Sequence, residues 1–335
     1  MNREPIRIAL VRLTALGDII NGTIVLQLIK KHYPNAQIEW FCEAAFAPVL
    51  EGHPDLLKVH AVPIKRIKKE KSLALLKATV SALKASGPFD KIIDMQGLIK
   101  SAVVARLIGK NIHGFDKASA RESLASRFYA THSHIPYEEN VIRRNIDVVA
   151  QALGFKVSDG EILAKQPCFA SREKPAFLAS GTKNIAFVIG ASWPSKEYPK
   201  ERFSELALDL KEARCILIWG SEREREYANF IAKNAPNAVV APKLSLAELR
   251  AVIEHCDLTI GNDTGPTHLA WAMNRPSITL FGPTNTRMIY ETPINLACES
   301  DSKVDINKID KNDFSIRTIP VEVIADKAKG LLAAE

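Results

Sequence analysis

Residues 261–268, Gly-Asn-Asp-Thr-Gly-Pro-Thr-His, combine residue types that suit an anionic ligand. The apolar run Leu258–Gly261 predicts a buried strand. The segment from Thr264 to Met273 predicts a helix with Pro266 in its first turn, where the missing N–H of proline is not needed. The start of a helix presents unpaired N–H groups and the positive end of its dipole, which together attract a diphosphate.

Four residues of this motif have predicted roles. Gly265 has no side chain that would block an anion, and Thr264 and His268 are one helical turn apart and can face the same anion. Asp263 would repel a phosphate, so we expect it to accept hydrogen bonds from sugar hydroxyls. A helix cap beside a packed core histidine is the plainer interpretation of a short motif. The agreement of strand, turn, proline and histidine favours a nucleotide-sugar site.

Two further strand ends in the second half of the chain carry compatible groups. Ser192 and Lys196, in the loop after the predicted strand Asn184–Ile189, suit a diphosphate. Glu224 follows the predicted strand Cys215–Trp219 and suits a ribose diol. Each signal is weak alone, but with residues 263–268 they place phosphate- and sugar-compatible groups at three strand ends of one predicted domain.

In the first half, polar residues again follow predicted strands. Asp18, which opens the first predicted helix after Gly17, is interpreted either as a helix cap or as a general base that accepts a proton from a hydroxyl. Gln96 and Lys100, after the strand Lys91–Met95, suit a carboxylate or a phosphate, and a solvated loop is the alternative.

Basic residues are concentrated between positions 58 and 71, where Glu70 is the single acid. The usual explanation of such a run is a solvated face, and the alternative is capture of an acidic headgroup at a membrane surface. No aromatic residues are interleaved with the charges, which weakens a single-stranded nucleic-acid interpretation. The basic residues are Lys58, Lys65, Arg66, Lys68, Lys69 and Lys71.

Apolar strand-like runs alternate with amphipathic segments along the whole chain, which predicts parallel sheets covered by helices on both faces. The segment Ser158–Lys183, rich in Pro, Ser, Gly and Lys, separates two such series, so we expect two α/β/α domains with a cleft between them. Ligands of such sheets bind beyond the carboxyl ends of the strands. The other strands expected are Ile6–Val11, Ala36–Cys42, Val59–Val62, Asn111–Phe115, Ala238–Val240 and Ser277–Phe281. The other helices expected are 18–31, 72–85, 99–108, 121–129, 140–153, 199–210, 222–233, 246–255 and 321–332.

The composition of the chain and the motifs that it lacks disfavour several classes of protein. The 335 residues are 47% hydrophobic and 25% charged, a balance typical of globular domains. No apolar run reaches about 18 residues, so no transmembrane helix is expected, and the first residues are interpreted as a strand and not as a signal peptide. The net charge of +7 permits an anionic partner without identifying it. Neither a Gly-x-Gly-x-x-Gly nor a Gly-Lys-[Ser/Thr] loop occurs, which disfavours nicotinamide dehydrogenases and P-loop ATPases. The five cysteines form no Cys-x-x-Cys pair and are expected to be buried free thiols.

With these motifs the chain resembles the bacterial lipopolysaccharide heptosyltransferases. The similarity rests on Asp263-Thr-Gly-Pro-Thr-His-Leu-Ala, on the opening Gly17-Asp18 and on the loop with Ser192 and Lys196, and it covers nearly the whole chain. Residues 94–102, Asp-Met-Gln-Gly-Leu-Ile-Lys-Ser-Ala, and residues 113–122, His-Gly-Phe-Asp-Lys-Ala-Ser-Ala-Arg-Glu, resemble the heptosyltransferase I branch.

The resemblance implies a GT-B fold, with two Rossmann-like domains whose parallel sheets face a central cleft. It assigns residues 1–160 to an acceptor-binding domain and residues 183–319 to an ADP-heptose-binding domain. Residues 320–335 would form a C-terminal helix that crosses back and packs on the first domain. The implied reaction moves L-glycero-D-manno-heptose from ADP-L-glycero-β-D-manno-heptose to Kdo of the lipid A inner core, with inversion.

The resemblance also implies roles for individual residues. Asp18 would be the base, Lys196 and Ser192 would hold the diphosphate with the helix start at Thr264 and Gly265, and Asp263 and His268 would contact the heptose and the phosphate. Glu224 would bind the ribose. This chain has Ala191-Ser192 where family members often carry paired threonines, so one phosphate contact is expected to be missing. The acceptor would be received by Lys65, Arg66, Lys68, Lys69, Gln96, Lys100 and Arg121.

No metal site and no cofactor are expected, because no Asp-x-Asp motif occurs and a cation with a helix start can stabilise the departing ADP. The enzyme is expected in the cytoplasm, peripheral at the inner membrane and without a nucleic-acid partner; the sequence leaves its oligomeric state open. The alternatives are a heptosyltransferase II-type enzyme that adds a later heptose, a nucleotide-sugar epimerase of the same architecture, and a non-enzymatic basic module that binds nucleic acid or membranes.

Overall fold

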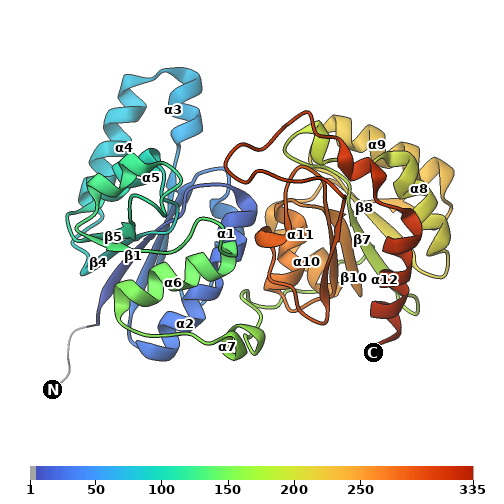
Figure 1. The fold of residues 1–335 in the computed structure, drawn as a ribbon, viewed down its shortest axis with the longest axis horizontal. Coiled ribbons are helices and arrows are strands. Elements are labelled where there is room, and N and C mark those ends of the chain that lie inside the picture. Colours follow the sequence, from blue (N-terminus) through green and yellow to red (C-terminus); the bar gives the residue numbers. More distant parts are fainter. Residues whose placement is uncertain (1–4, 335) are drawn as a thin grey trace. The chain divides into compact units, whose positions relative to one another are not determined.

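Two separate six-stranded sheets, all of whose strand pairs are parallel, organise the computed structural model, which describes residues 5–334 (Figure 1). The chain divides into two units, one that ends at Ala170 and one that starts at Ser171. This division falls inside the segment Ser158–Lys183, where the composition places a domain boundary. Each unit is described by itself below.

The first sheet has the strand order β3-β2-β1-β4-β5-β6. Its central strands are almost fully buried, with Ile8 and Leu10 of β1 and Ile93 of β4 at 0% exposure. This burial explains their near-continuous apolar sequences, because helices cover both faces of a parallel sheet. The strands are β1 (Arg7–Val11), β2 (Gln37–Glu43), β3 (Lys58–Val62), β4 (Lys91–Asp94), β5 (Ile112–Phe115) and β6 (Thr131–Ser133).

Helices cover the two faces of the first sheet. On one face α6 (Val141–Leu153) packs against α1 (Leu16–Gly22) and α2 (Ile24–His32), and on the other α5 (Ile99–Ile108) packs against α4 (Leu73–Ala85) (Figure 1). The remaining helical segments of this unit are α3 (Ile64–Glu70), α7 (Asp159–Leu163) and the 3₁₀ turns η1 (Ala47–Val49) and η2 (Ser123–Phe128).

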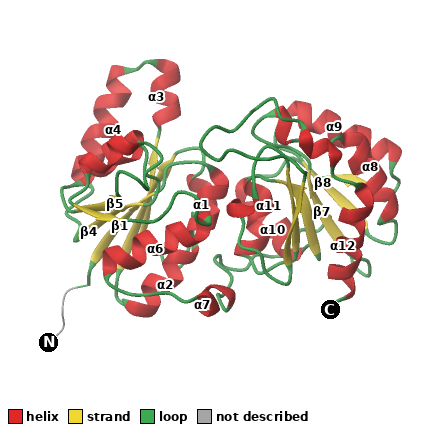
Figure 2. Cartoon of the chain, viewed as in Figure 1, coloured by secondary structure: helices red, strands yellow, loops and turns green. Residues whose placement is uncertain are grey.

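The second sheet repeats this topology with the order β12-β11-β10-β7-β8-β9. Its strands are β7 (Asn184–Val188), β8 (Arg214–Ile218), β9 (Ala238–Val240), β10 (Leu258–Asn262), β11 (Ser277–Phe281) and β12 (Asn295–Glu299). One face is covered by α8 (Lys200–Asp209), α9 (Glu222–Asn234) and α12 (Val321–Ala333), and the other by α10 (Leu246–His255) and α11 (Gly265–Ala272) (Figure 2). The 3₁₀ turns of this unit are η3 (Pro194–Lys196), η4 (Thr286–Met288) and η5 (Ser315–Thr318).

Both sheets reverse their strand order at one central pair, β1 with β4 in the first unit and β7 with β10 in the second. Ligands of doubly wound sheets bind at this reversal, beyond the carboxyl ends of the two strands. The segments that directly follow these four strands contain Asp18, Gln96, Lys196 and Asp263. The topology therefore brings the residues singled out by the sequence to the expected position of each sheet.

Several elements of the first unit differ from the sequence-based expectation. The single helix expected over 18–31 is two helices, because the Thr23 hydroxyl donates to the Ile20 carbonyl at 2.6 Å and interrupts the regular pattern. In place of the helix expected over 121–129, the structure has the 3₁₀ segment η2. A hydrogen bond from the N–H of Glu122 to the Gly97 carbonyl, 3.1 Å long, fixes the residue just before this segment. Helix α3 was not predicted, since its sequence was interpreted as a charged run.

Helix α12 packs on the second unit. Its buried residues Val321, Ile324, Ala325 and Ala328 share one hydrophobic cluster with the strands of the second sheet. The Tyr198 hydroxyl also donates to a carbonyl just before the helix, that of Ile319, at 2.8 Å. The apolar periodicity predicts a buried face but does not specify which core receives it, and in the structure this face packs on the core of the second unit. The crossing of this helix back to the first domain stays a prediction.

Candidate active site

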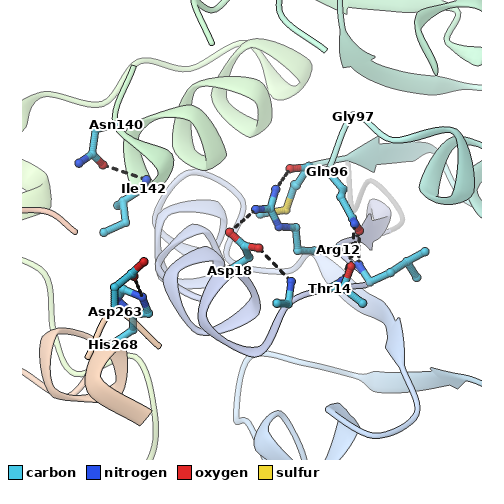
Figure 3. Close-up of polar contacts among 12 residues, drawn as sticks. Arg12, Thr14, Asp18, Gln96, Gly97, Asn140, Ile142, Asp263 and His268 are labelled. Carbon is cyan, nitrogen blue, oxygen red and sulfur yellow. Dashed lines mark hydrogen bonds and ion pairs between the residues drawn. The ribbon is translucent and has the colours of Figure 1, made fainter. Parts of the chain in front are cut away.

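Asp263 is the centre of a buried polar cluster in the second unit. It follows β10 directly and is 2% exposed. Its Oδ2 accepts a hydrogen bond from Lys196 Nζ at 2.5 Å and another from the Thr284 hydroxyl at 2.8 Å. Its Oδ1 lies 3.1 Å from His268 Nε2 (Figure 3). Three side chains from three separate segments therefore converge on one carboxylate.

The charge of this carboxylate follows from its partners. Burial alone would raise the pKa of Asp263, but the Lys196 ammonium and the contact with His268 outweigh it and hold the pKa below its usual value. An ionised carboxylate only accepts hydrogen bonds, so Nε2 of His268 carries the proton that it shares. The other ring nitrogen, Nδ1, is buried without a hydrogen-bond partner among the described residues.

Lys196 and Asp263 form an ion pair that the sequence analysis did not predict. The sequence assigned the cation to a diphosphate and the carboxylate to a sugar, whereas the structure pairs them, with side chains that are 9% and 2% exposed. An ammonium group carries three protons, so the pairing positions Lys196 without using all its donors. Thr284, in the loop after β11, was missed because nothing in its local sequence Gly-Pro-Thr-Asn indicates a partner.

Asn262 holds the loop that carries Lys196. Its side-chain Nδ2 donates to the Ile189 carbonyl at 2.8 Å, and its Oδ1 accepts from the Tyr198 N–H at 3.0 Å. The side chain is fully buried, so it links the end of β10 to both ends of the loop after β7. Sequence reasoning missed this role, although a polar residue that ends an apolar strand just before Asp263 was an available signal.

The start of α11 keeps the features expected of an anion site. Thr264 occupies the N-cap position, but its side chain makes no hydrogen bond to the helix. The plainer interpretation of this motif as a helix cap is therefore right about the position of Thr264, although the side chain does not stabilise the helix start. Gly265 is the first helical residue and Pro266 follows it. Ser192, in the loop after β7, is exposed.

Glu224 has a structural role that the sequence did not indicate. Its Oε2 accepts from the N–H groups of Gly220 at 2.6 Å and Ser221 at 3.1 Å, and the Ser221 hydroxyl accepts from the Glu224 N–H at 3.3 Å, so the pair forms a capping box at the start of α9. A Cβ on Gly190 would lie 2.4 Å from the Glu224 carboxyl carbon. Glu224 therefore lies against Gly190, in the loop that carries Ser192.

Asp18 lies in the first unit, in the first turn of α1. Its Oδ1 forms an ion pair with Arg12 Nη2 at 2.8 Å, and its Oδ2 accepts from the Ala15 N–H at 2.9 Å (Figure 3). Ala15 is the N-cap residue, so Asp18 is not the cap, and its side chain remains 23% exposed. Arg12 is itself buried and also donates to the Met95 carbonyl. It ties the ends of β1 and β4 to the carboxylate, a role that the sequence did not indicate.

Gln96 and Lys100 lie beside the segment that joins β1 to α1, because β1 and β4 are neighbouring strands. The Gln96 amide oxygen accepts from the Leu13 N–H at 2.8 Å, and its amide nitrogen donates to the Thr14 hydroxyl at 3.0 Å (Figure 3). Lys100 Nζ donates to the same hydroxyl at 2.6 Å. Gln96 therefore braces the backbone that leads to Asp18, and Thr14 is a further site residue that sequence reasoning missed.

A buried carboxylate shapes the loop after β4. Asp94 is 0% exposed, and its oxygens accept from the Gln96 N–H and from the hydroxyls of Ser101 and Tyr129, each at 2.8 Å. Burial raises the pKa of Asp94 above its usual value, while these hydrogen bonds act against that rise. Asp94 therefore serves to position Gln96.

Four of the predicted acceptor cations lie on α3. Lys65, Arg66, Lys68 and Lys69 are exposed on α3, where Arg66 Nε also pairs with Glu70 at 2.8 Å.

Lys100 lies in the field of other predicted cations. Partial burial lowers the pKa of Lys100, Glu43 and Glu122 counter this effect, and the nearby charges of Lys65 and Arg121 add to it. The charges of Lys65 and Arg121 therefore act on Lys100 although the three residues come from separate segments, and the carboxylates of Glu43 and Glu122 act on it as well. None of the helices described between residues 5 and 334 is both long and apolar enough to cross a membrane.

Comparison with known proteins shows which family has a similar sequence and a similar fold. Residues 78–303 match the model of glycosyltransferase family 9 (heptosyltransferase). The chain is 38% identical to lipopolysaccharide heptosyltransferase 1 of Campylobacter coli, over 98% of this chain and 100% of the relative. It is 34% identical to the enzyme of the same name from Pseudomonas aeruginosa, over 83% of this chain and 79% of that relative. The solved structure of E. coli heptosyltransferase WaaC with ADP-2-deoxy-2-fluoro heptose superposes with a TM-score of 0.79 at 26% identity, over 97% of this chain and 99% of that one.

Proposed function

Because this chain belongs to glycosyltransferase family 9, the heptosyltransferases, we propose that it transfers L-glycero-D-manno-heptose from ADP-heptose to Kdo of the lipid A inner core. The observation that carries the proposal is the cluster of Lys196, Asp263 and His268 at the strand-order reversal of the second sheet. This cluster supports a site for a sugar nucleotide. The relatives from Campylobacter coli and Pseudomonas aeruginosa are both named lipopolysaccharide heptosyltransferase 1, which supports the choice of heptose and acceptor.

On the donor side, the second unit provides groups for the diphosphate and the sugars. Lys196, Ser192 and the helix start at Thr264 and Gly265 bind the diphosphate and stabilise the charge that develops on the departing ADP. Asp263 and His268 contact the heptose and its phosphate, with Asp263 kept ionised by its buried partners. Glu224 binds the adenosine ribose.

On the acceptor side, Asp18 is the general base. A Kdo hydroxyl oxygen forms the new bond to the anomeric carbon of the heptose while the bond from that carbon to the ADP oxygen breaks. The hydroxyl proton passes to Asp18, and the electron pair of the broken bond leaves with ADP. Attack opposite to the leaving group inverts the anomeric carbon. Arg12 holds the carboxylate in place through the 2.8 Å ion pair.

The departing ADP needs no metal ion in this proposal, because Lys196 and the start of α11 supply the positive charge. The test is turnover after exhaustive dialysis against EDTA. Turnover that persists supports the proposal. Loss of turnover with EDTA and its recovery with magnesium would show that a divalent ion supplies that charge.

The acceptor is lipid-bound and acidic, so the enzyme works in the cytoplasm, peripheral at the inner face of the inner membrane. Lys65, Arg66, Lys68, Lys69, Gln96, Lys100 and Arg121 receive the acceptor. The electrostatic influence of Lys65 and Arg121 on Lys100 supports this assignment, because it brings cations of separate segments within reach of one ligand. Nucleic acid is not a partner in this proposal.

The deciding experiment measures ADP release from ADP-heptose with and without lipid A that carries Kdo. Release only with this acceptor, together with a mass gain of one heptose, supports the proposal. Release only with an acceptor that already carries heptose would identify a heptosyltransferase II-type enzyme. Conversion of the sugar nucleotide without any acceptor would identify an epimerase.

A further inference from the structure

Helices α3 and α4 form a hairpin that contributes little to the core of the first unit. No residue of α3 is buried, and Leu83, near the end of α4, is the one buried residue of that helix. Both helices extend away from the first sheet, with α3 and the start of α4 at the far end (Figure 1). The far end of the hairpin is therefore free of the packing that explains most apolar residues.

The turn of the hairpin places leucine at its tip. Lys71 adopts a left-handed conformation with φ 50°, which ends α3. The Ser72 hydroxyl accepts from the Leu75 N–H at 3.2 Å and caps α4, so that Leu73 is the first helical residue. The side chain of Leu73 is 71% exposed and that of Leu76 is 42% exposed. Their spacing of three puts both on one face of α4.

Positive charge surrounds these two leucines. The hairpin tip, residues 65–77, contains Glu70 as its single acid, and Glu70 already pairs with Arg66. The basic residues of the tip are Lys65, Arg66, Lys68, Lys69, Lys71 and Lys77, all of them exposed. Leucines rimmed by lysines match an anionic lipid surface, where the apolar groups enter the acyl boundary and the ammonium groups meet phosphates.

We propose that the hairpin tip is the membrane-docking element of this protein, with Leu73 and Leu76 inserted into a bilayer of anionic lipid. The occupant is the bilayer itself and not the acceptor molecule. The proposal deepens the proposed function, because it rests on a lipid-bound acceptor, and it assigns to the leucines a task separate from the recognition of that acceptor by the lysines.

The test is flotation of the full-length protein with vesicles of phosphatidylcholine that contain phosphatidylglycerol and no acceptor. We expect wild-type protein to float with these vesicles and not with pure phosphatidylcholine. The double variant Leu73→Ser/Leu76→Ser should lower the partition coefficient about tenfold. The matched control, Leu163→Ser/Leu208→Ser, replaces two leucines that are 55% and 47% exposed elsewhere and should partition as wild type does.

Charge is tested separately with Lys71→Gly. Glycine adopts the left-handed conformation readily, so this variant removes a charge while it keeps the turn. It should bind anionic vesicles more weakly than wild type, with an unchanged melting temperature. No flotation of wild-type protein, or equal flotation of wild type and the double leucine variant, would return the tip to a solvated face.

Activity on detergent-dispersed acceptor separates this proposal from the proposed function. The double leucine variant should keep wild-type turnover there and lose turnover on acceptor embedded in vesicles. Wild-type protein that floats but transfers no heptose would leave the docking surface standing and overturn the assigned reaction. Transfer of heptose by wild-type protein that does not float would support the assigned reaction and overturn the docking surface.

Discussion

Lys196 Nζ lies 2.5 Å from Asp263 Oδ2, and both side chains are almost fully buried. The two residues are 67 positions apart and follow neighbouring strands, β7 and β10. Each is an isolated buried charge without the other, and an uncompensated charge in a protein interior is costly. The pair therefore couples the stability of the second unit to the geometry of the candidate donor site.

Removal of either partner of this pair should destabilise the second unit. We expect Lys196→Met and Asp263→Asn each to lower the free energy of unfolding by about 3–5 kcal/mol. The double variant should lose less than the sum, because it leaves no unpaired charge. Urea denaturation of the four proteins measures the coupling, and additive losses would show that the two side chains do not interact in solution.

The same pair predicts a pH dependence of stability. Since the pKa of Asp263 is lowered in the folded protein, its contribution is complete above the unfolded pKa of about 3.9 and is lost as pH falls from there toward the folded pKa. Thermal melts between neutral and acidic pH should show a steeper acid limb for wild type than for Asp263→Asn. Equal slopes would mean that Asp263 titrates normally.

Asp18→Asn should reduce kcat by about 10²- to 10⁴-fold, because asparagine cannot accept the acceptor proton. Donor affinity, measured by calorimetry with ADP-heptose, should not change. The control is Asp116→Asn, which changes a carboxylate in the loop after β5, where Asp116 accepts from the Ser119 N–H at 2.8 Å. A loss of donor binding that matches the loss of turnover would make Asp18 a structural residue.

Gly190→Ala should weaken donor binding through Glu224. The new Cβ would fall 2.4 Å from the Glu224 carboxyl carbon and push this carboxylate away from the Gly220 N–H. We expect Gly190→Ala to bind ADP-heptose about three- to tenfold more weakly than wild type, the effect of losing one hydrogen bond. Glu224→Ala should weaken ADP-heptose binding by a similar factor. Gly160→Ala, where a Cβ meets the Ser158 hydroxyl at 3.9 Å, serves as the control. Normal binding by Gly190→Ala would separate Glu224 from the donor.

Neutralisation of the α3 cations should weaken binding of the acceptor and leave binding of the donor unchanged. Replacement of Lys65, Arg66, Lys68 and Lys69 by glutamine should raise the KM for detergent-dispersed acceptor roughly tenfold, since exposed charge pairs contribute weakly one by one, and should leave the KM for ADP-heptose unchanged. The charge-matched control replaces four exposed lysines of the second unit, Lys211, Lys233, Lys308 and Lys329. Equal acceptor KM values in the two variants would show that the charges of α3 form only a solvated face.

Much of the architecture was predictable from local sequence. Helices α5 and α10 and strands β9 and β11 have the predicted bounds, because strong periodicity and apolar runs reflect burial along one element. The strands that were missed, β6 (Thr131–Ser133) and β12 (Asn295–Glu299), lie at the sheet edges. β6 has the sequence Thr-His-Ser, and β12 begins with Asn295 and ends with Glu299, so neither strand carries a long apolar run.

The sequence by itself determined that two series of parallel strands and helices form, and that phosphate- and sugar-compatible residues follow particular strands. Only the tertiary structure decided which of these residues meet. It paired Lys196 with Asp263, set Arg12 against Asp18 and placed α12 on the second core. Local periodicity records which residues are buried, whereas partners in space depend on strand order, and strand order is set by the packing of the whole sheet.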